Sequence, residues 1–318
     1  VLPAKPKQEY NQKPQLKWWR GEIGPHTLAS VTPAMIVSCR GKLLTETGKN
    51  GKPRSPATVN RYLAVLSHAF TVAVNDWGWL EDSPMRKVKK HTEPRGRIRF
   101  LSDDEADEDG ETIDGERTRL LKACKASDNP YLYTVVVLAL STGMRQGEIM
   151  GLTWDDVDLH QGRITLYETK NGEIRVVPLV GKALELLTAK DKARKEEKVR
   201  RIDTNLLFPG KRKKDKAEPV KPMDLRAPWM AALKAAKVDD FRFHDLRHTA
   251  ASLMLNHGIP VIVVSKILGH AKPSTTLDIY GHLIHEMQGE AAKVMDELVT
   301  PIRLEMSSSI VTILPKGR

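Results

Sequence analysis

The sequence predicts a mostly α-helical protein with a small β-sheet, which is an α+β fold. Apolar residues recur at three- and four-residue spacing over much of the chain, as they do on the buried faces of helices. One segment, 163–179, instead carries two β-rich runs that flank a turn. The length of 318 residues favours two domains, because single hydrophobic cores rarely grow beyond about 250–300 residues.

The first third of the chain contains two helix starts. Segments 32–47 and 55–76 each begin with a hydroxyl residue followed by proline, the usual pairing at an N-cap and first helical position. The second segment also has an apolar stripe at three- and four-residue spacing. Residues 1–17 are rich in Pro and Lys without an apolar period, so we expect a tether there. Residues 18–88 then form a small, basic, helical domain.

A strongly charged stretch separates this domain from the rest. RKVKKHTEPRGRIRF (86–100) has no core-forming pattern, and DDEADEDGETIDGE (103–116) holds nine carboxylates. We interpret 89–116 as a linker with an acidic insert. The linker either wraps a nucleic-acid duplex or is a solvated tether. A divalent metal could bind the carboxylates, but they lack the alternation of a calcium-binding loop, and a solvated loop is the favoured interpretation.

Residues 117–300 are expected to form a second, mixed domain, and 301–318 a C-terminal tail. The hairpin of this second domain, 163–179, turns at Lys170-Asn171-Gly172, a strong signal for a tight turn. The helices are expected at about 117–126, 130–142, 145–152, 181–198, 222–237, 244–257, 260–268, 274–284 and 286–298.

Charge is distributed unevenly along the chain. The net charge is +11, and residues 1–100 carry all of it, with 18 Lys and Arg against 7 Asp and Glu. Such an excess favours binding to a polyanion, although it also serves solubility or acidic protein partners. No apolar stretch is long enough to span a membrane. Cys39 and Cys124 are too few for a disulfide framework or a cysteine-based metal site, which favours reduced thiols in a cytoplasm.

Two arginines lie where an anion could bind. Arg145 follows a glycine near a helix start, where free N–H groups attract anions, but an ion pair with Glu148 would also explain it. His244 and Arg247 are three residues apart, so on a helix they share a face and could reach one phosphate. A solvated helix face is the ordinary alternative.

Three further residues each have an ordinary structural explanation when taken alone. Lys170 could be a charged turn residue, and His270 could simply follow a glycine helix terminator. Tyr280 could be a packed aromatic residue. Their order along the chain, together with that of the arginines, points to a shared site.

The motifs resemble the tyrosine recombinase family, which includes phage integrases. The resemblance covers about residues 27–285. It is carried by STGMRQGEI (141–149), FHDLRHTAASLML (243–255) and ILGHAKPSTTLDIYGH (267–282). Segment 55–85 also resembles the helical core-binding domain of phage integrases. The family implies a core-binding domain followed by a mixed catalytic domain that breaks and rejoins DNA through a Holliday junction.

The resemblance implies a covalent mechanism. Tyr280 would attack the scissile phosphate, giving a 3′-phosphotyrosyl link and a free 5′-hydroxyl. Because a tyrosine hydroxyl has an ordinary pKa of about 10, it needs a base, and His244 would be that base. Lys170 would protonate the leaving oxygen.

The same resemblance implies a phosphate clamp. Arg145 and Arg247 would bind the non-bridging oxygens, His270 would donate a hydrogen bond, and Glu148 would orient the site. These groups supply the needed charge without a metal or another cofactor, and no phosphate-binding loop for ATP is present.

The implied partners are double-stranded DNA core or attachment sites and a homotetramer on paired sites. A host DNA-bending protein and an excisionase are implied more loosely. The helix expected at 285–299 either packs within its own subunit or docks on a neighbour. The candidate DNA-contacting residues are basic residues of the first domain and the linker: Lys49, Lys52, Arg54, Arg61, Lys87, Lys89, Lys90, Arg95 and Arg97.

Three other functions stay open. A type IB topoisomerase would share the chemistry, whereas a DNA-binding protein with a decayed site would lack it. A metal-dependent nuclease would use the acidic insert. The chain departs from the family in that insert. Many phage integrases also carry an arm-binding domain, which residues 1–17 are too short to form, so either the protein lacks this domain or it lies outside this sequence.

Overall fold

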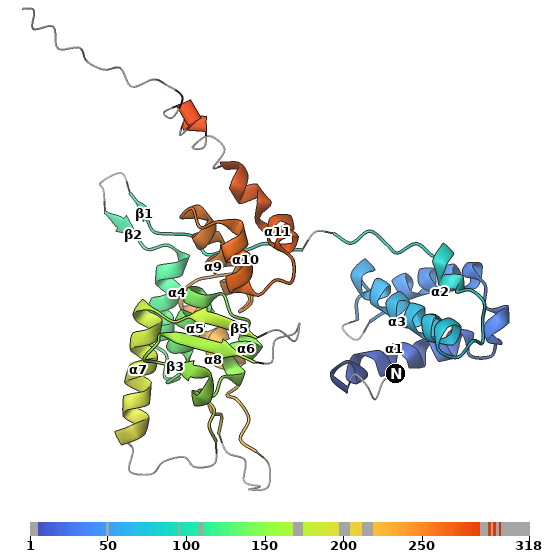
Figure 1. The fold of residues 1–318 in the computed structure, drawn as a ribbon, viewed down its shortest axis with the longest axis horizontal. Helices are drawn as coiled ribbons and strands as arrows, with labels where there is room; N and C mark the ends of the chain where they lie inside the picture. Colours follow the sequence, from blue (N-terminus) through green and yellow to red (C-terminus); the bar gives the residue numbers. More distant parts are fainter. Residues whose placement is uncertain are drawn as a thin grey trace, which may run out of the picture. The chain divides into compact units, whose positions relative to one another are not determined.

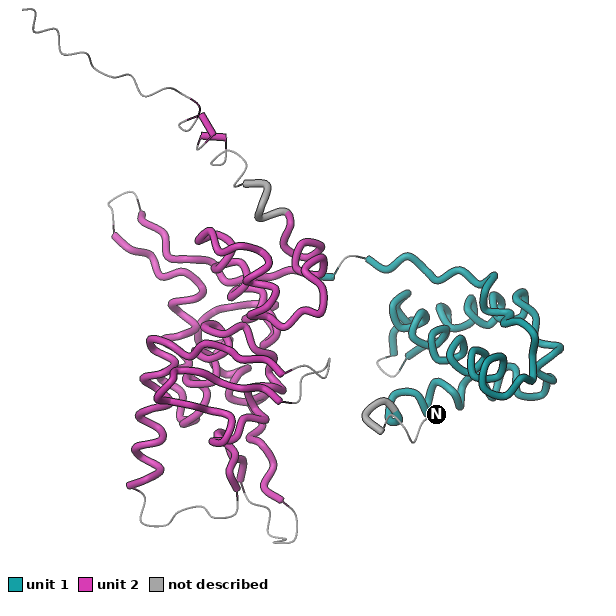
Figure 2. The backbone as a smooth tube through the Cα atoms, in the orientation of Figure 1, with its two compact units in different colours: residues 1–96 teal, residues 97–318 magenta. Residues whose placement is uncertain are grey.

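The computed structural model describes residues 6–48, 51–94, 96–107, 111–167, 174–196, 204–211 and 219–286, with five further positions between 292 and 299. The chain divides into two compact units, residues 1–96 and 97–318 (Figure 2). The boundary falls within the stretch interpreted as a linker. None of the described helices has the length and apolar content needed to cross a membrane.

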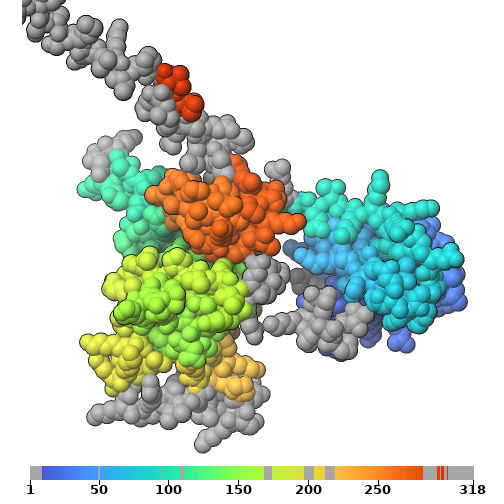
Figure 3. Space-filling model, in the orientation of Figure 1, coloured from blue at the N-terminus to red at the C-terminus, as the bar shows by residue number. Residues whose placement is uncertain are grey.

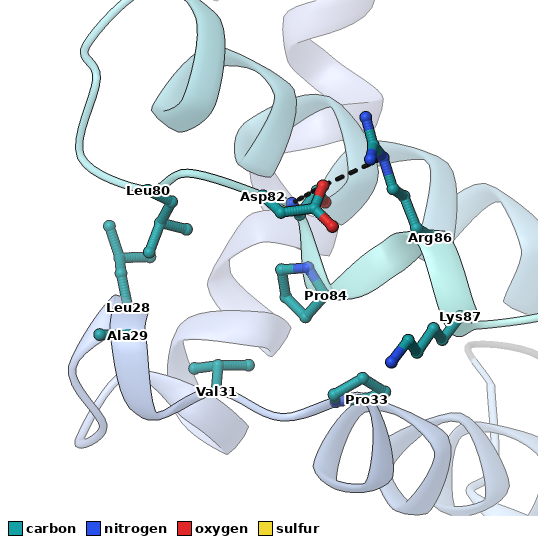
Figure 4. A pocket seen from close by; sticks show the side chains of 10 residues that line it. Leu28, Ala29, Val31, Pro33, Leu80, Asp82, Pro84, Arg86 and Lys87 are labelled. Atoms are coloured by element: carbon teal, nitrogen blue, oxygen red, sulfur yellow. Dashed lines mark hydrogen bonds and ion pairs between the residues drawn. The ribbon is translucent and has the colours of Figure 1, made fainter.

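The first unit is helical. Its elements are α1 (Pro6–Ile23), the 3-10 helix η1 (Leu28–Ser30), α2 (Pro33–Thr45), α3 (Pro56–Asn75) and the 3-10 helix η2 (Pro84–Lys87) (Figure 1). The expected N-caps are confirmed: the Thr32 hydroxyl accepts from the backbone N–H of Met35, and that of Ser55 accepts from Thr58. A pocket of about 230 Å³ lies between η1 and η2, lined by Leu28, Val31, Leu80 and Pro84 among others (Figure 4).

The tether expected over residues 1–17 is wrong for residues 6–17, which belong to α1. The helix forms because its C-terminal half is anchored to α3. Trp19 is 2% exposed and its indole N–H donates to the carbonyl of Tyr62 at 2.8 Å. Burying a tryptophan contributes about 1.5–3 kcal/mol or more, which offsets the weak helical pattern of the residues before it.

The second unit is mixed, and the expected small sheet is confirmed. Its elements before the sheet are β1 (Glu105–Ala106), β2 (Thr112–Ile113), α4 (Glu116–Lys125), α5 (Leu132–Thr142), α6 (Gln146–Gly151) and the 3-10 helix η3 (Trp154–Asp156). The sheet consists of β3 (Val157–Asp158), β4 (Arg163–Leu166) and β5 (Arg175–Pro178), antiparallel and in that order. After it come α7 (Gly181–Glu196), α8 (Arg226–Ala235), α9 (Asp245–Asn256), α10 (Val261–Leu268) and α11 (Pro273–Glu286).

Helix α5 is the centre of this unit. It is buried on nearly every side and packs against α4, α6, α7 and α9. The buried sheet residues Ile164 and Val177 join the same core. A second, smaller core forms among α9, α10 and α11. In Figure 3 the orange surface of this part of the chain borders the yellow-green surface of the middle of the chain. The helix expected at 286–298 lies largely outside the described residues.

Candidate active site

The turn between α5 and α6 presents Arg145. Helix α5 ends at Gly143, whose φ of +61° favours glycine, and a Cβ there would lie 2.6 Å from the side chain of Leu268. Glu148 in the first turn of α6 accepts from the backbone N–H of Arg145 at 2.9 Å and from its guanidinium at 2.8 Å. The carboxylate therefore fixes both the backbone and the side chain of Arg145.

Arg247 lies on α9 and is 4% exposed. One guanidinium nitrogen, Nη1, donates to the carbonyl of Gly143 at 2.7 Å, which joins α9 to the turn before Arg145. The other, Nη2, is buried and has no hydrogen-bond partner among the described residues. Burial, with the nearby charge of Arg145, lowers the pKa of Arg247 to about 10, so the side chain is a cation at neutral pH. A buried cation with an unused donor suits an anionic ligand.

Tyr280 lies on α11 and is 1% exposed, packed in the small core with Ala251 and Val264. Its hydroxyl is 2.8 Å from Nδ1 of His248. Burial raises the pKa of Tyr280 to about 12, against the opposing charge of Arg247. The hydroxyl is therefore protonated at neutral pH and needs a proton acceptor before it can act as a nucleophile.

Both expected histidines, His244 and His270, belong to this cluster. His270 follows the α10 terminator, and its Nδ1 is 2.8 Å from the Thr276 hydroxyl. Burial, then the charges of three arginines, lowers the pKa of His270 to about 4, so it is neutral at pH 7. His244 precedes α9 and is exposed; burial of part of the ring and the charge of Arg247 lower its pKa. Both can offer hydrogen bonds without adding charge.

Lys170 lies outside the described residues, although β4 and β5, which lead to and from its turn, are paired as expected. The same hairpin supplies a residue that the sequence interpretation missed. Arg175 on β5 donates to Glu148 at 2.6 Å and to the carbonyl of Ile267 at 3.2 Å. A signal was present in the sequence, because Arg175 shares the inward face of the strand with Val177.

His248 was missed as well. It directly follows Arg247 in the first turn of α9 and lies four residues after His244, the N-cap of that helix, so the three side chains are neighbours. The rings of His244 and His248 are 5.3 Å apart and nearly perpendicular. The spacing alone could have suggested His248 as a site residue.

The candidate DNA-contacting residues fall into three groups. The exposed residues are Lys52, Arg61, Lys87, Lys89 and Lys90. Two are engaged in ion pairs: Arg54 with Glu46 at 2.7 Å, and Arg97 with Asp240 and Asp245. Lys49 and Arg95 lie outside the described residues.

The acidic insert has internal partners. Asp104 accepts from the backbone N–H of Gly115 at 2.7 Å and from the Thr118 hydroxyl at 2.9 Å. Glu116 pairs with Arg99 at 2.5 Å. These carboxylates therefore hold the linker end against α4.

Comparison with known proteins places these observations in a family. Residues 114–287 match the model of the phage integrase family. The chain is 31% identical to the shufflon-specific DNA recombinase of Escherichia coli over 278 residues, covering 87% of this chain and 64% of that protein. It is 27% identical to the integrase of Salmonella phage P22, covering 91% of this chain and 75% of that one. The chain thus spans less than two thirds of the first relative.

Solved structures share the fold. The Tn1549 transposon integrase in complex with circular intermediate DNA aligns with a TM-score of 0.62 at 19% identity, covering 87% of this chain and 89% of that one. A λ integrase dimer bound to a COC′ core site aligns with a TM-score of 0.59 at 20% identity, covering 86% and 71%. Since the family model matches more than half of the sequence, this chain belongs to the phage integrase family.

Proposed function

We propose that this protein is a site-specific DNA recombinase that cuts and rejoins DNA through a covalent link between Tyr280 and a 3′-phosphate. One observation carries the proposal. A buried tyrosine hydroxyl lies in the same cluster as Arg247, a buried cation whose Nη2 has no partner among the described residues. A phosphodiester oxygen is the ligand that would satisfy this nitrogen.

The clamp acts on the charge of the phosphate. Arg145 and Arg247 bind the non-bridging oxygens, where planar guanidiniums match the geometry and neutralise charge as the fifth bond to phosphorus forms. His270 is neutral at pH 7 and donates from Nε2 when its Nδ1 accepts the Thr276 hydroxyl. The groups are held before substrate arrives, so little reorganisation is needed during the reaction.

The reaction conserves phosphodiester bonds. As the Tyr280 oxygen bonds to phosphorus, the bond to the 5′-oxygen breaks and Lys170 gives that oxygen a proton. The phosphotyrosyl bond retains the energy of the original linkage, so a 5′-hydroxyl from another strand can attack it without ATP. Successive exchanges between two duplexes pass through a Holliday junction.

The partners follow from this reaction. The substrate is double-stranded DNA carrying short core or attachment sites, and the active assembly is a homotetramer on two paired sites. A host DNA-bending protein and an excisionase regulate direction. The site of action is the bacterial cytoplasm. The basic residues of the first unit and the linker contact the phosphate backbone.

Covalent trapping tests the nucleophile. The protein is incubated in EDTA with a pool of nicked duplexes of varied core sequence, denatured, and assayed for DNA bound to protein. We expect adducts with the unsubstituted protein and none with Tyr280→Phe. Tyr131→Phe is the matched control, because Tyr131 packs on Phe208 in the same unit and should be dispensable.

The outcomes separate the competing functions. Adducts that persist in Tyr280→Phe would refute the nucleophile assignment, and cleavage that EDTA abolishes would indicate a metal-dependent nuclease. Strand exchange between two differently labelled duplexes distinguishes a recombinase from an enzyme that only relaxes supercoils.

A further inference from the structure

The nucleophile is hydrogen-bonded to a histidine that the family resemblance does not assign. The Tyr280 hydroxyl lies 2.8 Å from His248 Nδ1, with ring centroids 5.7 Å apart. His248 projects from α9 and Tyr280 from α11, so the contact joins two helices that share a small core. His244, the base expected from the sequence, stands one turn earlier against the His248 ring.

The hydroxyl needs such a partner. With a pKa of about 12, Tyr280 is ionised in roughly one molecule in 10⁵ at pH 7. Waiting for spontaneous ionisation would therefore slow attack by about five powers of ten. A base in direct contact removes the proton while the bond to phosphorus forms, which avoids this loss.

His248 is in the right protonation state to accept a proton. Burial, then the charge of His244, lowers the pKa of His248, so its ring stays neutral to a lower pH than that of an ordinary histidine. When the tyrosine hydroxyl donates, Nδ1 is the acceptor and the ring proton lies on Nε2. The titratable and charged groups that face His248 are His244, Asp245 and Arg247 on α9, Arg97 on the linker, Tyr280 on α11, and His270 after α10.

We propose that His248, rather than His244, is the catalytic residue that accepts the proton of Tyr280. The proton moves from the tyrosine oxygen to Nδ1 as that oxygen bonds to phosphorus, and the 5′-oxygen leaves with a proton from Lys170. In rejoining, the 5′-hydroxyl returns its proton to Lys170 and His248 returns its own to Tyr280. The inference rests on the proposed recombinase reaction.

The test is the pH dependence of single-turnover adduct formation on a nicked duplex. We expect His248→Asn, whose amide can accept a hydrogen bond but cannot take up the proton, to slow the reaction by about 10²–10⁴-fold at pH 7. The residual rate should rise about tenfold per pH unit, because the tyrosine must then ionise by itself. His248→Gln provides a second variant with a longer amide.

Two comparison variants sharpen the result. His257→Asn changes a histidine on the exposed C-terminal end of the same helix, where Nδ1 contacts the carbonyl of Leu253, and should leave rate and profile unchanged. His244→Asn should be slower, yet its rate should still level off near neutral pH, as that of the unsubstituted protein does once His248 is neutral. Melting temperature and non-covalent DNA binding confirm that each variant is folded.

The outcomes are distinct. If the rate of the His248 variants still levels off near neutral pH while that of His244→Asn does not, His244 is the acceptor and the inference is wrong. If the His248 variants react at the normal rate, the contact is only packing, and the inference is again wrong. Both results differ from failure of the proposed function, in which the unsubstituted protein would form no adduct at all.

Discussion

At the scale of single residues, Glu148 organises the arginines of the proposed phosphate clamp. Its carboxylate holds Arg145 and Arg175 together, and both side chains at the Arg175 contact are largely buried, 9% and 11% exposed. Burial alone would raise the pKa of Glu148, but the backbone N–H of Arg145 and the charge of Arg175 keep it below the ordinary value. In the proposed clamp, Arg175 would thus be a positioning residue, since it contacts Glu148, which in turn holds Arg145.

Arg175→Lys should slow adduct formation by roughly 10- to 100-fold, because hydrogen bonds to charged groups are worth about 1.5–3 kcal/mol and lysine cannot make both. A methylphosphonate at the scissile position removes the charge that Arg145 neutralises. The defect should therefore shrink on that substrate. Arg163→Lys on β4, where the side chain is 48% exposed, is the control. Equal defects on both substrates would mean that Arg175 only supports the fold.

His270 should make stability depend on pH. Its pKa falls from 6.5 to about 4 on folding, so the unfolded chain binds the proton more readily between these values. The stability that depends on the neutral ring is present above about pH 6.5 and is lost as the pH falls toward 4. His270→Gln removes this effect. In thermal melts, the melting temperature of the unsubstituted protein should exceed that of His270→Gln by more at about pH 7 than at about pH 4. A difference in melting temperature that does not change with pH would contradict the lowered pKa.

The sequence predicted some residues of the candidate site but not others. Arg145, Arg247, His270 and Tyr280 could be named because short motifs carry them. The contacts of Arg175 could not be predicted, because its partners Glu148 and Ile267 lie 27 and 92 residues away in sequence. Only packing brings three such distant segments together around one guanidinium.

At the scale of elements, the end of α10 is shaped by the arginine beside it. Gly269 has φ +66°, and a Cβ there would clash with Nη1 of Arg175 and lie 3.0 Å from its Cδ. Because that guanidinium is buried and already bound to Glu148, it has little freedom to move aside. The turn therefore requires glycine for two independent reasons, its conformation and its close neighbour.

Gly269→Ala and Gly258→Ala form a matched pair. Gly258 follows α9 with φ +76°, and a methyl group at that position would have no neighbouring atom within 4 Å. Each substitution should cost about 1–2 kcal/mol for the left-handed backbone, measured by denaturant unfolding. Only Gly269→Ala should also reduce adduct formation, by displacing Arg175. Equal loss of activity in both variants would show that the close approach is unimportant.

The elements themselves were largely predictable. The starts of α2 and α3 were indicated by N-cap hydroxyls and prolines, and the hairpin by its Asn-Gly turn. Helix α1 was missed because its apolar anchors, Trp18 and Trp19, lie at one end of an otherwise polar segment. Their burial depends on α3, which sequence periodicity within α1 does not reveal.

At the scale of the whole molecule, the excess positive charge lies in the first unit and the linker. Changing Lys87, Lys89 and Lys90 to Gln should lower the slope of log affinity against log salt by about 2–3, if each lysine neutralises one phosphate. Changing Lys182, Lys192 and Lys195 on α7 to Gln removes the same charge from another surface. Equal slopes in the two triple variants would mean that only net charge matters.

The linker is attached firmly at both ends. On the first unit, Asn60 accepts from the backbone N–H of His91 at 2.9 Å and donates to its carbonyl at 2.8 Å. On the second unit, Arg97 pairs with Asp245, and the backbone N–H of Leu101 donates to the Thr249 hydroxyl at 3.1 Å. These contacts tie the linker to the first unit at His91 and to the second unit from Arg97 onward.

The contact with Asp245 joins the linker to the candidate active site, because Asp245 is the first residue of the helix that carries Arg247 and His248. Through the Arg97–Asp245 ion pair, the linker is tied to the first turn of that helix, and a pull on the linker would act on this turn. We therefore expect Asp245→Asn to loosen this grip, so that adduct formation becomes less sensitive to the length of the linker.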